Sequence, residues 1–476
     1  MKLNKKTKIV ATLGPATSKK EVLKSMLEAG ANIFRINFSH ADYDDVRERV
    51  KMIRSLNDEY GFNAGILADL QGPKLRVGKM KEDVLVSPGD QITFKTGEPF
   101  LGNKKEVYMN YKTFPEDVKP GERILLDDGK LIFEVKKTNK KDEVLAEVIQ
   151  GGPLRSRKGV NLPNTNISLP ALTEKDIKDA KFACELEVDW MALSFVRYAS
   201  DLKLLQKLIS ENSAHKIPII AKIEKPEGVK NIDKIIAYCD GLMVARGDLG
   251  VEIPAHEVPL IQKKLVLKAK EGRIPVIIAT QMMETMIDSL TPTRAEVNDV
   301  GNSVMDGADA VMLSGETSVG KYPVQVIEKM SQVIRAVENS PLIKVPHQPP
   351  YIKTKRYITK SICYHAALMA NEIGANAICT LTNSGYTAFQ ISAWRPSSNI
   401  LAFTSNKRIL TQLSLLWGVS AYYYDKFNST DETIEDIKTI AKEKGYVSKG
   451  DYTVNLAAMP IEAKGMVNTL RISEIK

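Results

Sequence analysis

Residues 217–229 read Ile217-Pro218-Ile219-Ile220-Ala221-Lys222-Ile223-Glu224-Lys225-Pro226-Glu227-Gly228-Val229. The apolar run predicts a buried strand that ends in a lysine and a glutamate two residues apart. Because side chains alternate between the faces of a strand, Lys222 and Glu224 should point to the same side. An ammonium group there can neutralise phosphate or enolate charge, while the carboxylate holds a divalent metal. A salt bridge that closes the end of the strand explains the pair equally well.

Five other apolar runs also end in polar residues. In the run Asn32–His40, three polar side chains share one face and the phenylalanines share the other. The polar groups at the ends of these five runs are Arg35, Asn37 and Ser39; Asp69; Arg246 and Asp248; Thr280; and Ser314 and Glu316. Six such ends in one chain predict that the side chains meet in one polar cavity.

Strand-like runs alternate with amphipathic helical stretches, and this alternation predicts a parallel sheet. The eight predicted strands are Lys8–Thr12, Asn32–Phe38, Ala64–Leu70, Asp189–Val196, Ile217–Ile223, Gly241–Ala245, Pro275–Ala279 and Ala310–Leu313. Eight strands favour an α/β fold of the (β/α)8 TIM barrel type, with functional groups at the carboxyl ends of the strands. An open, doubly wound sheet is the alternative, but it gathers its ligand groups at one switch point.

Helix starts fall between these strands. Ser18 with Glu21 and Thr293 with Glu296 have the spacing of capping boxes, and Thr173 with Asp176 is a weaker form of the same signal.

Two breaks divide the chain into domains. Gly72-Pro73 opens a region of alternating residues and tight turns that closes at Gly151-Gly152-Pro153 and Pro163-Asn164, and four prolines between Pro341 and Pro350 mark a linker. The C-terminal part again alternates, with strands expected near Ala377–Thr382, Ile400–Thr404, Val419–Tyr424, Tyr452–Ala457 and Thr469–Ile472. We therefore expect a barrel in two parts (residues 1–72 and 170–343), an inserted all-β lid domain, a small β-barrel (73–169), and a C-terminal α/β regulatory domain (344–476).

Composition narrows the choice of partners. The net charge of +9 fits phosphorylated small molecules or nucleic acid. The basic residues are dispersed and are not interleaved with aromatic residues, so we expect no nucleic-acid partner. No apolar run is long enough to span a membrane, so no membrane partner is expected. The four cysteines lack metal-ligand spacing and indicate reduced thiols in the cytoplasm.

Seven segments together make the chain similar to one known family. They are Thr7-Lys8-Ile9-Val10-Ala11-Thr12-Leu13-Gly14-Pro15, Phe34-Arg35-Ile36-Asn37-Phe38-Ser39-His40, Ala68-Asp69-Leu70-Gln71-Gly72-Pro73-Lys74, the Lys222–Glu224 strand, Ala245-Arg246-Gly247-Asp248-Leu249-Gly250, Pro292-Thr293-Arg294-Ala295-Glu296 and Met312-Leu313-Ser314-Gly315-Glu316-Thr317. In this order they resemble the pyruvate kinases from end to end. The resemblance implies phosphoryl transfer between phosphoenolpyruvate and ADP, giving pyruvate and ATP in the last step of glycolysis, by a homotetramer.

Four residues are expected to hold the metal and the transferring phosphate. Glu224 and Asp248 are oxygen donors suited to Mg2+, or to Mn2+, and the resemblance gives them the metal that also binds the enolpyruvate oxygens. Lys222 would stabilise the phosphoryl group and the enolate, and Arg35 would clamp the phosphate. The plainer alternatives are salt-bridging or helix-capping carboxylates and an Arg35–Asp69 ion pair.

Five more residues are assigned to the substrates. Gly247 would let a substrate carboxylate approach backbone N–H groups, and Thr280 would bind that carboxylate and, by resemblance, assist the protonation of enolpyruvate. The resemblance also gives Arg76 and Lys158, at the two edges of the lid, to the nucleotide phosphates, and His40 is a further candidate there. A strand-end cap for Thr280, solvated loop charges for the two lid cations and a structural histidine are the alternatives.

The chain departs from the family pattern where many members bind K+. That region corresponds to Asn37, Ser39 and Asp69, and many members carry a threonine and a glutamate where this chain has Leu70 and Lys74. An extra glutamate needs a counter-cation, and the ammonium group of Lys74 can be that cation itself. We therefore expect turnover without added K+, unless Lys74 merely faces solvent.

A turn in the C-terminal domain resembles the effector-phosphate loop of the family. It follows a predicted strand, opens a helix, and comprises Thr382, Asn383, Ser384, Gly385 and Thr387. Free N–H groups at such a turn favour an anion, although an ordinary helix cap has the same sequence. The later loop Met459–Asn468 lacks the tryptophan and arginine that accompany fructose 1,6-bisphosphate binding in many relatives. A monophosphate such as AMP or a sugar phosphate is therefore the favoured allosteric effector.

Three other functions were weighed. A metal-dependent enolate lyase could use the same arginine and carboxylates, but it needs neither ADP nor the lid cations. A non-catalytic nucleic-acid binder would use the basic charge without needing paired groups at strand ends. A nucleotide-sensing protein would keep the C-terminal loop and tolerate loss of Lys222.

Overall fold

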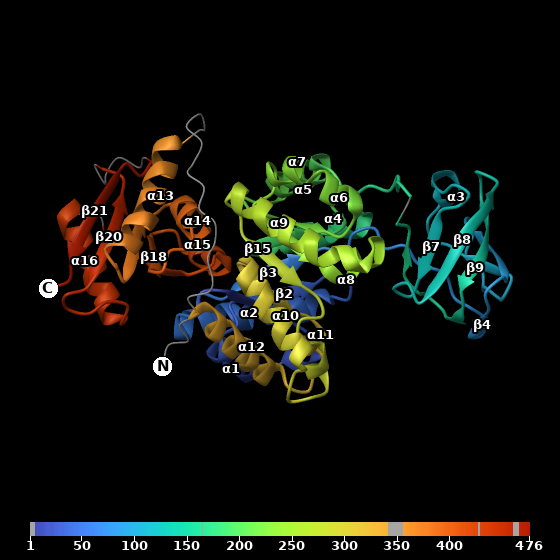
Figure 1. Ribbon diagram of the computed structural model, residues 1–476, viewed down its shortest axis with the longest axis horizontal. Helices are drawn as coiled ribbons and strands as arrows, with labels where there is room; N and C mark the ends of the chain where they lie inside the picture. Colours follow the sequence, from blue (N-terminus) through green and yellow to red (C-terminus); the bar gives the residue numbers. More distant parts are fainter. Residues whose placement is uncertain (1–4, 164, 341–355, 427–428, 460–465) are drawn as a thin grey trace.

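The computed structural model describes residues 5–163, 165–340, 356–426, 429–459 and 466–476. Along these residues the chain forms three parts, with the barrel between the insert on one side and the C-terminal domain on the other (Figure 1). The predicted proline-rich linker, residues 341–350, lies outside the described residues, and so do residues 460–465 of the later loop. The domain limits given above stay predictions.

Eight parallel strands close into the barrel, which confirms the predicted fold class. Their order around the barrel is β1-β16-β15-β14-β13-β12-β3-β2. Their bounds are β1 Lys8–Thr12, β2 Ile33–Asn37, β3 Gly65–Asp69, β12 Trp190–Leu193, β13 Ile219–Ile223, β14 Gly241–Ala245, β15 Val276–Ala279 and β16 Ala310–Leu313. Because all eight strands are parallel, their carboxyl ends, and the polar residues there, meet at one mouth.

Helices surround the barrel (Figure 1). Their bounds are α1 Lys20–Ala29, α2 Tyr43–Tyr60, α4 Glu174–Glu185, α5 Ala199–Asn212, α6 Pro226–Lys230, α7 Ile232–Ile236, α8 Arg246–Glu252, α9 Val258–Gly272, α10 Arg294–Asp306, α11 Gly315–Ser318 and α12 Pro323–Glu338, with short 3-10 helices η1 Pro15–Thr17, η2 Ala255–Glu257 and η3 Glu284–Ile287. The capping boxes predicted at Thr173 and Thr293 are present. The one predicted at Ser18 is wrong: Ser18 ends η1 with helical dihedral angles, and Lys19 is the N-cap of α1.

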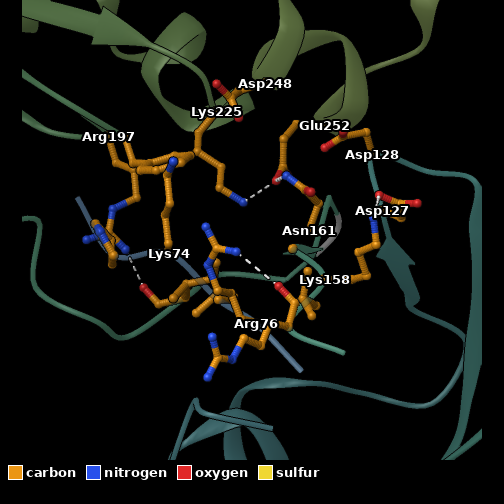
Figure 2. A pocket seen from close by; sticks show the side chains of 17 residues that line it. Lys74, Arg76, Asp127, Asp128, Lys158, Asn161, Arg197, Lys225, Asp248 and Glu252 are labelled. Atoms are coloured by element: carbon orange, nitrogen blue, oxygen red, sulfur yellow. Dashed lines mark hydrogen bonds and ion pairs between the residues drawn. The ribbon is translucent and has the colours of Figure 1, made fainter. Parts of the chain in front are cut away.

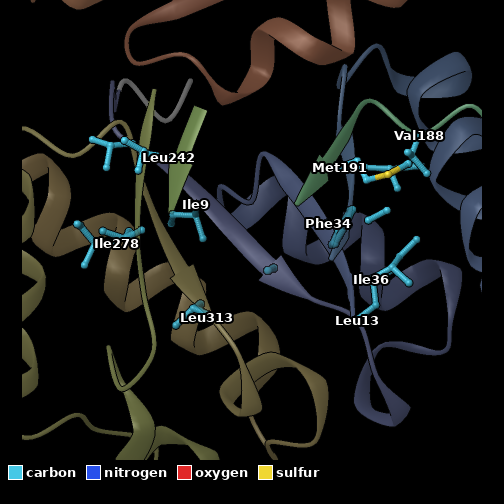
Figure 3. Close-up of a cluster of buried hydrophobic side chains, with 14 of the residues drawn as sticks. Ile9, Leu13, Phe34, Ile36, Val188, Met191, Leu242, Ile278 and Leu313 are labelled. Carbon is cyan, nitrogen blue, oxygen red and sulfur yellow. The ribbon is translucent and has the colours of Figure 1, made fainter. Parts of the chain in front are cut away.

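The barrel strands are buried on both faces, as their continuous apolar runs predict. Alternate residues of one strand, such as Ile9 and Val10 of β1, belong to two separate apolar clusters. The larger cluster, which includes Ile9, Phe34 and Ile278, fills the space between strands and helices (Figure 3). The other fills the barrel interior. This double burial makes the barrel a rigid support for the groups at its mouth.

The insert consists almost entirely of strands. Its elements are β4 Val84–Val86, β5 Gln91–Lys95, β6 Glu106–Tyr108, α3 Phe114–Asp117, β7 Arg123–Leu126, β8 Leu131–Thr138, β9 Glu143–Gln150, β10 Gly152–Leu154 and β11 Val160–Asn161. They form a six-stranded sheet, β11-β7-β8-β9-β5-β6, and the pair β10-β4. Isolated bridges join Arg76 to Gly159 and Val77 to Met109, so the segment that enters the insert lies between the two edges of the larger sheet.

The C-terminal domain has a five-stranded sheet in the order β19-β18-β17-β20-β21. Its elements are α13 Tyr357–Glu372, β17 Ala377–Leu381, α14 Tyr386–Ala393, β18 Asn399–Thr404, α15 Lys407–Gln412, η4 Leu413–Leu415, β19 Val419–Tyr423, α16 Thr430–Glu443, β20 Tyr452–Ala457 and β21 Thr469–Glu474. It packs on the amino-terminal end of the barrel, where Trp190 Nε1 donates to the Gln412 carbonyl at 3.1 Å and Arg395 pairs with Asp309 at 3.0 Å. The insert lies at the opposite end of the barrel, the mouth (Figure 1).

Within the described residues, no helix combines the length and the apolar character that crossing a bilayer requires.

Candidate active site

A chain of ion pairs links the ends of three barrel strands. Arg35 Nε donates to Asp69 Oδ2 at 2.6 Å, and Lys222 Nζ lies 3.1 Å from both Asp69 Oδ1 and Glu224 Oε1. The Arg35–Asp69 ion pair considered as the plainer alternative is therefore present, but as one link of a longer network. Lys222 is 8% exposed and Glu224 and Asp69 are each 1% exposed, so all three charges lie out of bulk water.

Burial and pairing set the charge states of this network. Burial raises the pKa of Asp69, but the cations of Lys222 and Arg35 outweigh it and hold that pKa below its ordinary value. Burial lowers the pKa of Lys222, and the carboxylates of Asp69 and Glu224 raise it more, so the amine stays protonated at any physiological pH. The site thus holds a fixed positive charge, which can neutralise an anionic ligand.

Glu224 has the opposite tendency. Burial and, to a smaller extent, repulsion from the Asp248 carboxylate raise the pKa of Glu224 to about 7. The Lys222 cation and the Phe195 N–H, which lies 2.7 Å from Glu224 Oε2, favour the charged form but do not offset this rise. A divalent cation between Glu224 and Asp248 would remove this repulsion, so the two carboxylates fit Mg2+, which takes few protein ligands and keeps several waters. Among the residues described, no group of three or more His, Cys, Asp or Glu side chains is placed to hold a metal.

A strained corner places Thr280 beside Gly247. Thr280 and the next residue, Gln281, have φ values of 70° and 53°, which β-branched and other side chains rarely adopt. Arg246 holds this corner: it donates to the Thr280 carbonyl at 2.8 Å and is itself fixed by Asp299 at 2.6 and 2.7 Å. Thr280 Oγ1 accepts from the Gly247 N–H at 2.7 Å, so the two predicted carboxylate-binding groups are adjacent.

The lid cations and Asp248 line one cavity of about 300 Å³ between the insert and the barrel. Figure 2 shows Lys74, Arg76 and Lys158 around it, with Asp248 on the barrel side. Lys158 Nζ pairs with Asp127 at 2.9 Å, and Arg76 Nη1 donates to the Arg157 carbonyl at 3.0 Å. Both cations therefore have partners already, yet they stay at the cavity, where an anionic ligand could compete for them.

Lys74 does not simply face solvent. Its pKa is lowered, first by burial and then by the Lys222 and Arg76 cations, although the Asp248 and Glu224 carboxylates raise it. Its ammonium group is thus electrostatically coupled to the Asp248 and Glu224 carboxylates and to Lys222.

The remaining predicted residues lie in different settings. His40 is exposed and is not among the residues that line this cavity. Asn37 Oδ1 accepts from the Ser39 N–H at 3.2 Å, and Leu70 is buried. In the C-terminal turn, Gly385 has φ 77° and its N–H donates to Thr382 Oγ1 at 2.9 Å.

The other three residues of that turn differ in exposure. Asn383 and Ser384 are exposed, whereas Thr387 is buried with its hydroxyl 2.8 Å from that of Thr380.

Sequence reasoning missed three members of the site. Ser194 accepts from Lys222 Nζ at 2.7 Å, Thr12 accepts from Arg35 at 3.0 Å, and Phe195 donates its N–H to Glu224. Ser194 and Thr12 are polar residues at the ends of predicted strands, the same signal that identified the other groups.

Buried cations and carboxylates at the mouth of a parallel barrel, under an insert with basic side chains, fit the class of enzymes that act on phosphorylated substrates. The model of the pyruvate kinase barrel domain matches residues 4–327, and that of the pyruvate kinase alpha/beta domain matches residues 360–473. This chain belongs to the pyruvate kinase family.

Individual relatives agree with this assignment. The chain is 40% identical to the pyruvate kinase of Corynebacterium glutamicum over 99% of its own length and 98% of the relative, and 42% identical to that of Bacillus licheniformis over 98% of its length and 80% of the relative. A crystal structure of a pyruvate kinase from Cryptosporidium parvum matches 99% of this chain and 96% of that one, with a TM-score of 0.91 and 32% identity.

The reaction follows from the family. The chain is a phosphotransferase that passes the phosphoryl group of phosphoenolpyruvate to ADP and forms pyruvate and ATP, the last step of glycolysis. Enzymes of this family use a divalent metal. The lyase, nucleic-acid-binding and sensor functions considered above are set aside.

Proposed function

We propose that the mouth of the barrel carries out this transfer with Arg35 and Lys222 on the phosphoryl group, Glu224 and Asp248 on Mg2+ (or Mn2+), and Thr280 on the substrate carboxylate. The observation that carries the proposal is the buried ion-pair network Arg35–Asp69–Lys222–Glu224. ADP-dependent release of pyruvate from phosphoenolpyruvate, with Lys222 variants, is the test and is developed in the Discussion.

The residues would act mainly by position and charge, which is what phosphoryl transfer requires. The guanidinium of Arg35 is held by Asp69 and Thr12, so it would meet the phosphate without reorganising. Lys222 would neutralise the charge that develops on the phosphoryl and enolate oxygens. The metal, when bound, supplies Lewis-acid polarisation of the enolpyruvate and phosphate oxygens. Gly247 and the Thr280 hydroxyl would orient the substrate carboxylate, and Thr280 would help to deliver the final proton to the enol carbon.

The nucleotide would enter the cavity lined by Arg76 and Lys158. Their present partners, a neutral carbonyl of Arg157 and the single carboxylate of Asp127, carry less negative charge than a diphosphate, so both cations could turn toward ADP. We keep His40 as a further nucleotide contact, although its exposed position gives it less support than the other two.

Metal affinity should depend on pH through Glu224. The metal binds the deprotonated carboxylate, and the pKa is raised to about 7, so protons compete with the metal below that pH. The apparent affinity of the substrate-free enzyme for Mn2+ should fall about tenfold for each pH unit below 7 and level off above it. Electron paramagnetic resonance of free Mn2+ measures this. Glu224→Gln, which cannot titrate, should bind weakly without this slope, and a wild-type affinity constant from pH 6 to 8 would contradict the prediction.

We further propose that turnover needs no K+. Lys74 would supply the positive charge near Asp248 and Glu224 that K+ supplies in many relatives, and its electrostatic coupling to both carboxylates supports this role. The predicted K+ region at Asn37, Ser39, Asp69 and Leu70 would then need no bound K+.

We propose that the turn Thr382–Gly385 binds the phosphate of a monophosphate effector, AMP or a sugar phosphate. The exposed Asn383 and Ser384 leave room for an anion there. Adding either monophosphate should lower the KM for phosphoenolpyruvate, and Ser384→Asp, which places a carboxylate in the turn, should abolish the effect. Thr439→Asp, an exposed position on α16, is the control. A response to fructose 1,6-bisphosphate alone would reverse the assignment.

We also propose that the protein is a homotetramer and is located in the cytoplasm. An apolar groove of about 460 Å³ between α10 and α12, with Val297 and Met305 exposed, supports a subunit contact on that face. The four cysteines are free and buried, which fits a reducing compartment.

A further inference from the structure

One buried carboxylate joins the insert to the mouth of the barrel. Glu252, the last residue of α8, accepts from Lys225 Nζ at 2.6 Å and from Asn161 Nδ2 at 2.8 Å, both on Oε1. Figure 2 shows the three side chains in a row at the cavity. Glu252 is 3% exposed and its Oε2 has no hydrogen bond, so this charge is kept out of water by its partners.

The two partners come from functionally different parts of the site. Asn161 lies in β11, three residues after Lys158, whereas Lys225 directly follows Glu224 at the end of β13. Lys225 is also buried and is neutralised by Glu252. The contact therefore connects the segment that contains Lys158 and β11 to the segment that follows β13 and contains Glu224.

We infer that Glu252 and Asn161 are positioning residues for ADP: their hydrogen bond fixes β11, and with it Lys158, over the mouth of the barrel. Lys225 holds the Glu252 carboxylate in place beside Asn161 through the ion pair at 2.6 Å. The inference rests on the proposed role of Lys158 in nucleotide binding.

Loss of the Asn161–Glu252 hydrogen bond should weaken the binding of one substrate, ADP. Without the bond, ADP has to bear the cost of ordering the lid, which weakens its binding. The phosphoenolpyruvate groups lie on barrel strands and do not need this bond. A bond that only stabilises the fold would instead leave the KM values unchanged and lower the melting temperature.

The test reverses which side chain of the Asn161–Glu252 contact donates the hydrogen bond and which accepts it. Asn161→Asp sets two carboxylates against each other and should raise the KM for ADP about tenfold or more, with the KM for phosphoenolpyruvate changed less than about twofold. Combining Asn161→Asp with Glu252→Gln restores one donor and one acceptor, and it should bring the KM for ADP back to within about threefold of the wild type. Gln150→Ala, which removes an exposed amide of the insert that donates to the Lys130 carbonyl, should leave both KM values unchanged.

Three results separate this inference from the function on which it rests. If the double variant is no better than Asn161→Asp, or if both KM values rise together, the positioning role is wrong. If Lys158→Ala raises the KM for ADP and Asn161→Asp does not, the nucleotide site stands and the positioning role falls. If Lys158→Ala leaves the KM for ADP unchanged, the proposed nucleotide site itself is wrong. Thermal unfolding of each variant shows whether it is folded.

Discussion

Lys222→Ala should lower kcat for ADP-dependent pyruvate formation by about 10³- to 10⁴-fold, the largest effect expected of any single substitution in this chain. The ammonium group is buried, permanently charged and surrounded by the Asp69 and Glu224 carboxylates and the Ser194 hydroxyl. Inside such a site a charge acts through a low dielectric, so its loss is felt far more than at the surface. The charge is needed most as the phosphoryl group leaves the enolate oxygen, so kcat should fall more than the KM for phosphoenolpyruvate rises.

Two controls make this result interpretable. Lys216→Ala removes an exposed lysine that also pairs with an aspartate, Asp240, and activity should stay within about twofold of the wild type. Circular dichroism and thermal unfolding establish that the Lys222 variant is folded, because removing one partner of a buried network can also destabilise the protein. A folded variant that keeps more than about a tenth of the wild-type kcat would refute the assigned role.

The barrel could be predicted from the sequence because each of its strands carries its own signal. A strand buried on both faces reads as a continuous apolar run, and the predicted bounds of all eight strands lie within three residues of the observed ones at each end. The failure at Ser18 has a local cause. The short helix Pro15–Thr17 takes up Ser18 at its end, and the extended backbone that an N-cap needs falls on Lys19.

The site could be predicted less completely, for a physical reason. Lys222 and Glu224 could be identified from the sequence because they lie two residues apart at the end of one apolar run. Their partners depend on which strands become neighbours: Ser194 is 28 residues from Lys222, and Asn161 is 91 from Glu252. No local pattern encodes such contacts, and the hydrogen bond to the Thr280 carbonyl likewise comes from Arg246, at the start of α8 and 34 residues away in the sequence.

Lys74→Glu should make the enzyme depend on K+, the second large effect. In the wild type, activity in a buffer with tetramethylammonium as the only monovalent cation should equal that with K+, because Lys74 already supplies the charge. The substitution removes this cation and adds a carboxylate near Asp248 and Glu224, which already repel each other. Without K+, kcat/KM for phosphoenolpyruvate should drop about 100-fold, and K+ should recover most of it.

The neighbouring Leu70 decides how complete that recovery is. Leu70 is buried and offers no side-chain oxygen, so adding Leu70→Thr to Lys74→Glu should lower the K+ concentration needed for half-maximal rate. Lys81→Glu makes the same charge change at an exposed site in the insert and should leave the enzyme indifferent to K+. Near-zero wild-type activity in tetramethylammonium, restored by K+, would show that Lys74 does not replace the ion. Loss of activity in Lys74→Glu that K+ fails to reverse would show instead that this lysine acts on a substrate, because a missing cation can be replaced whereas a missing contact to the nucleotide or phosphate cannot.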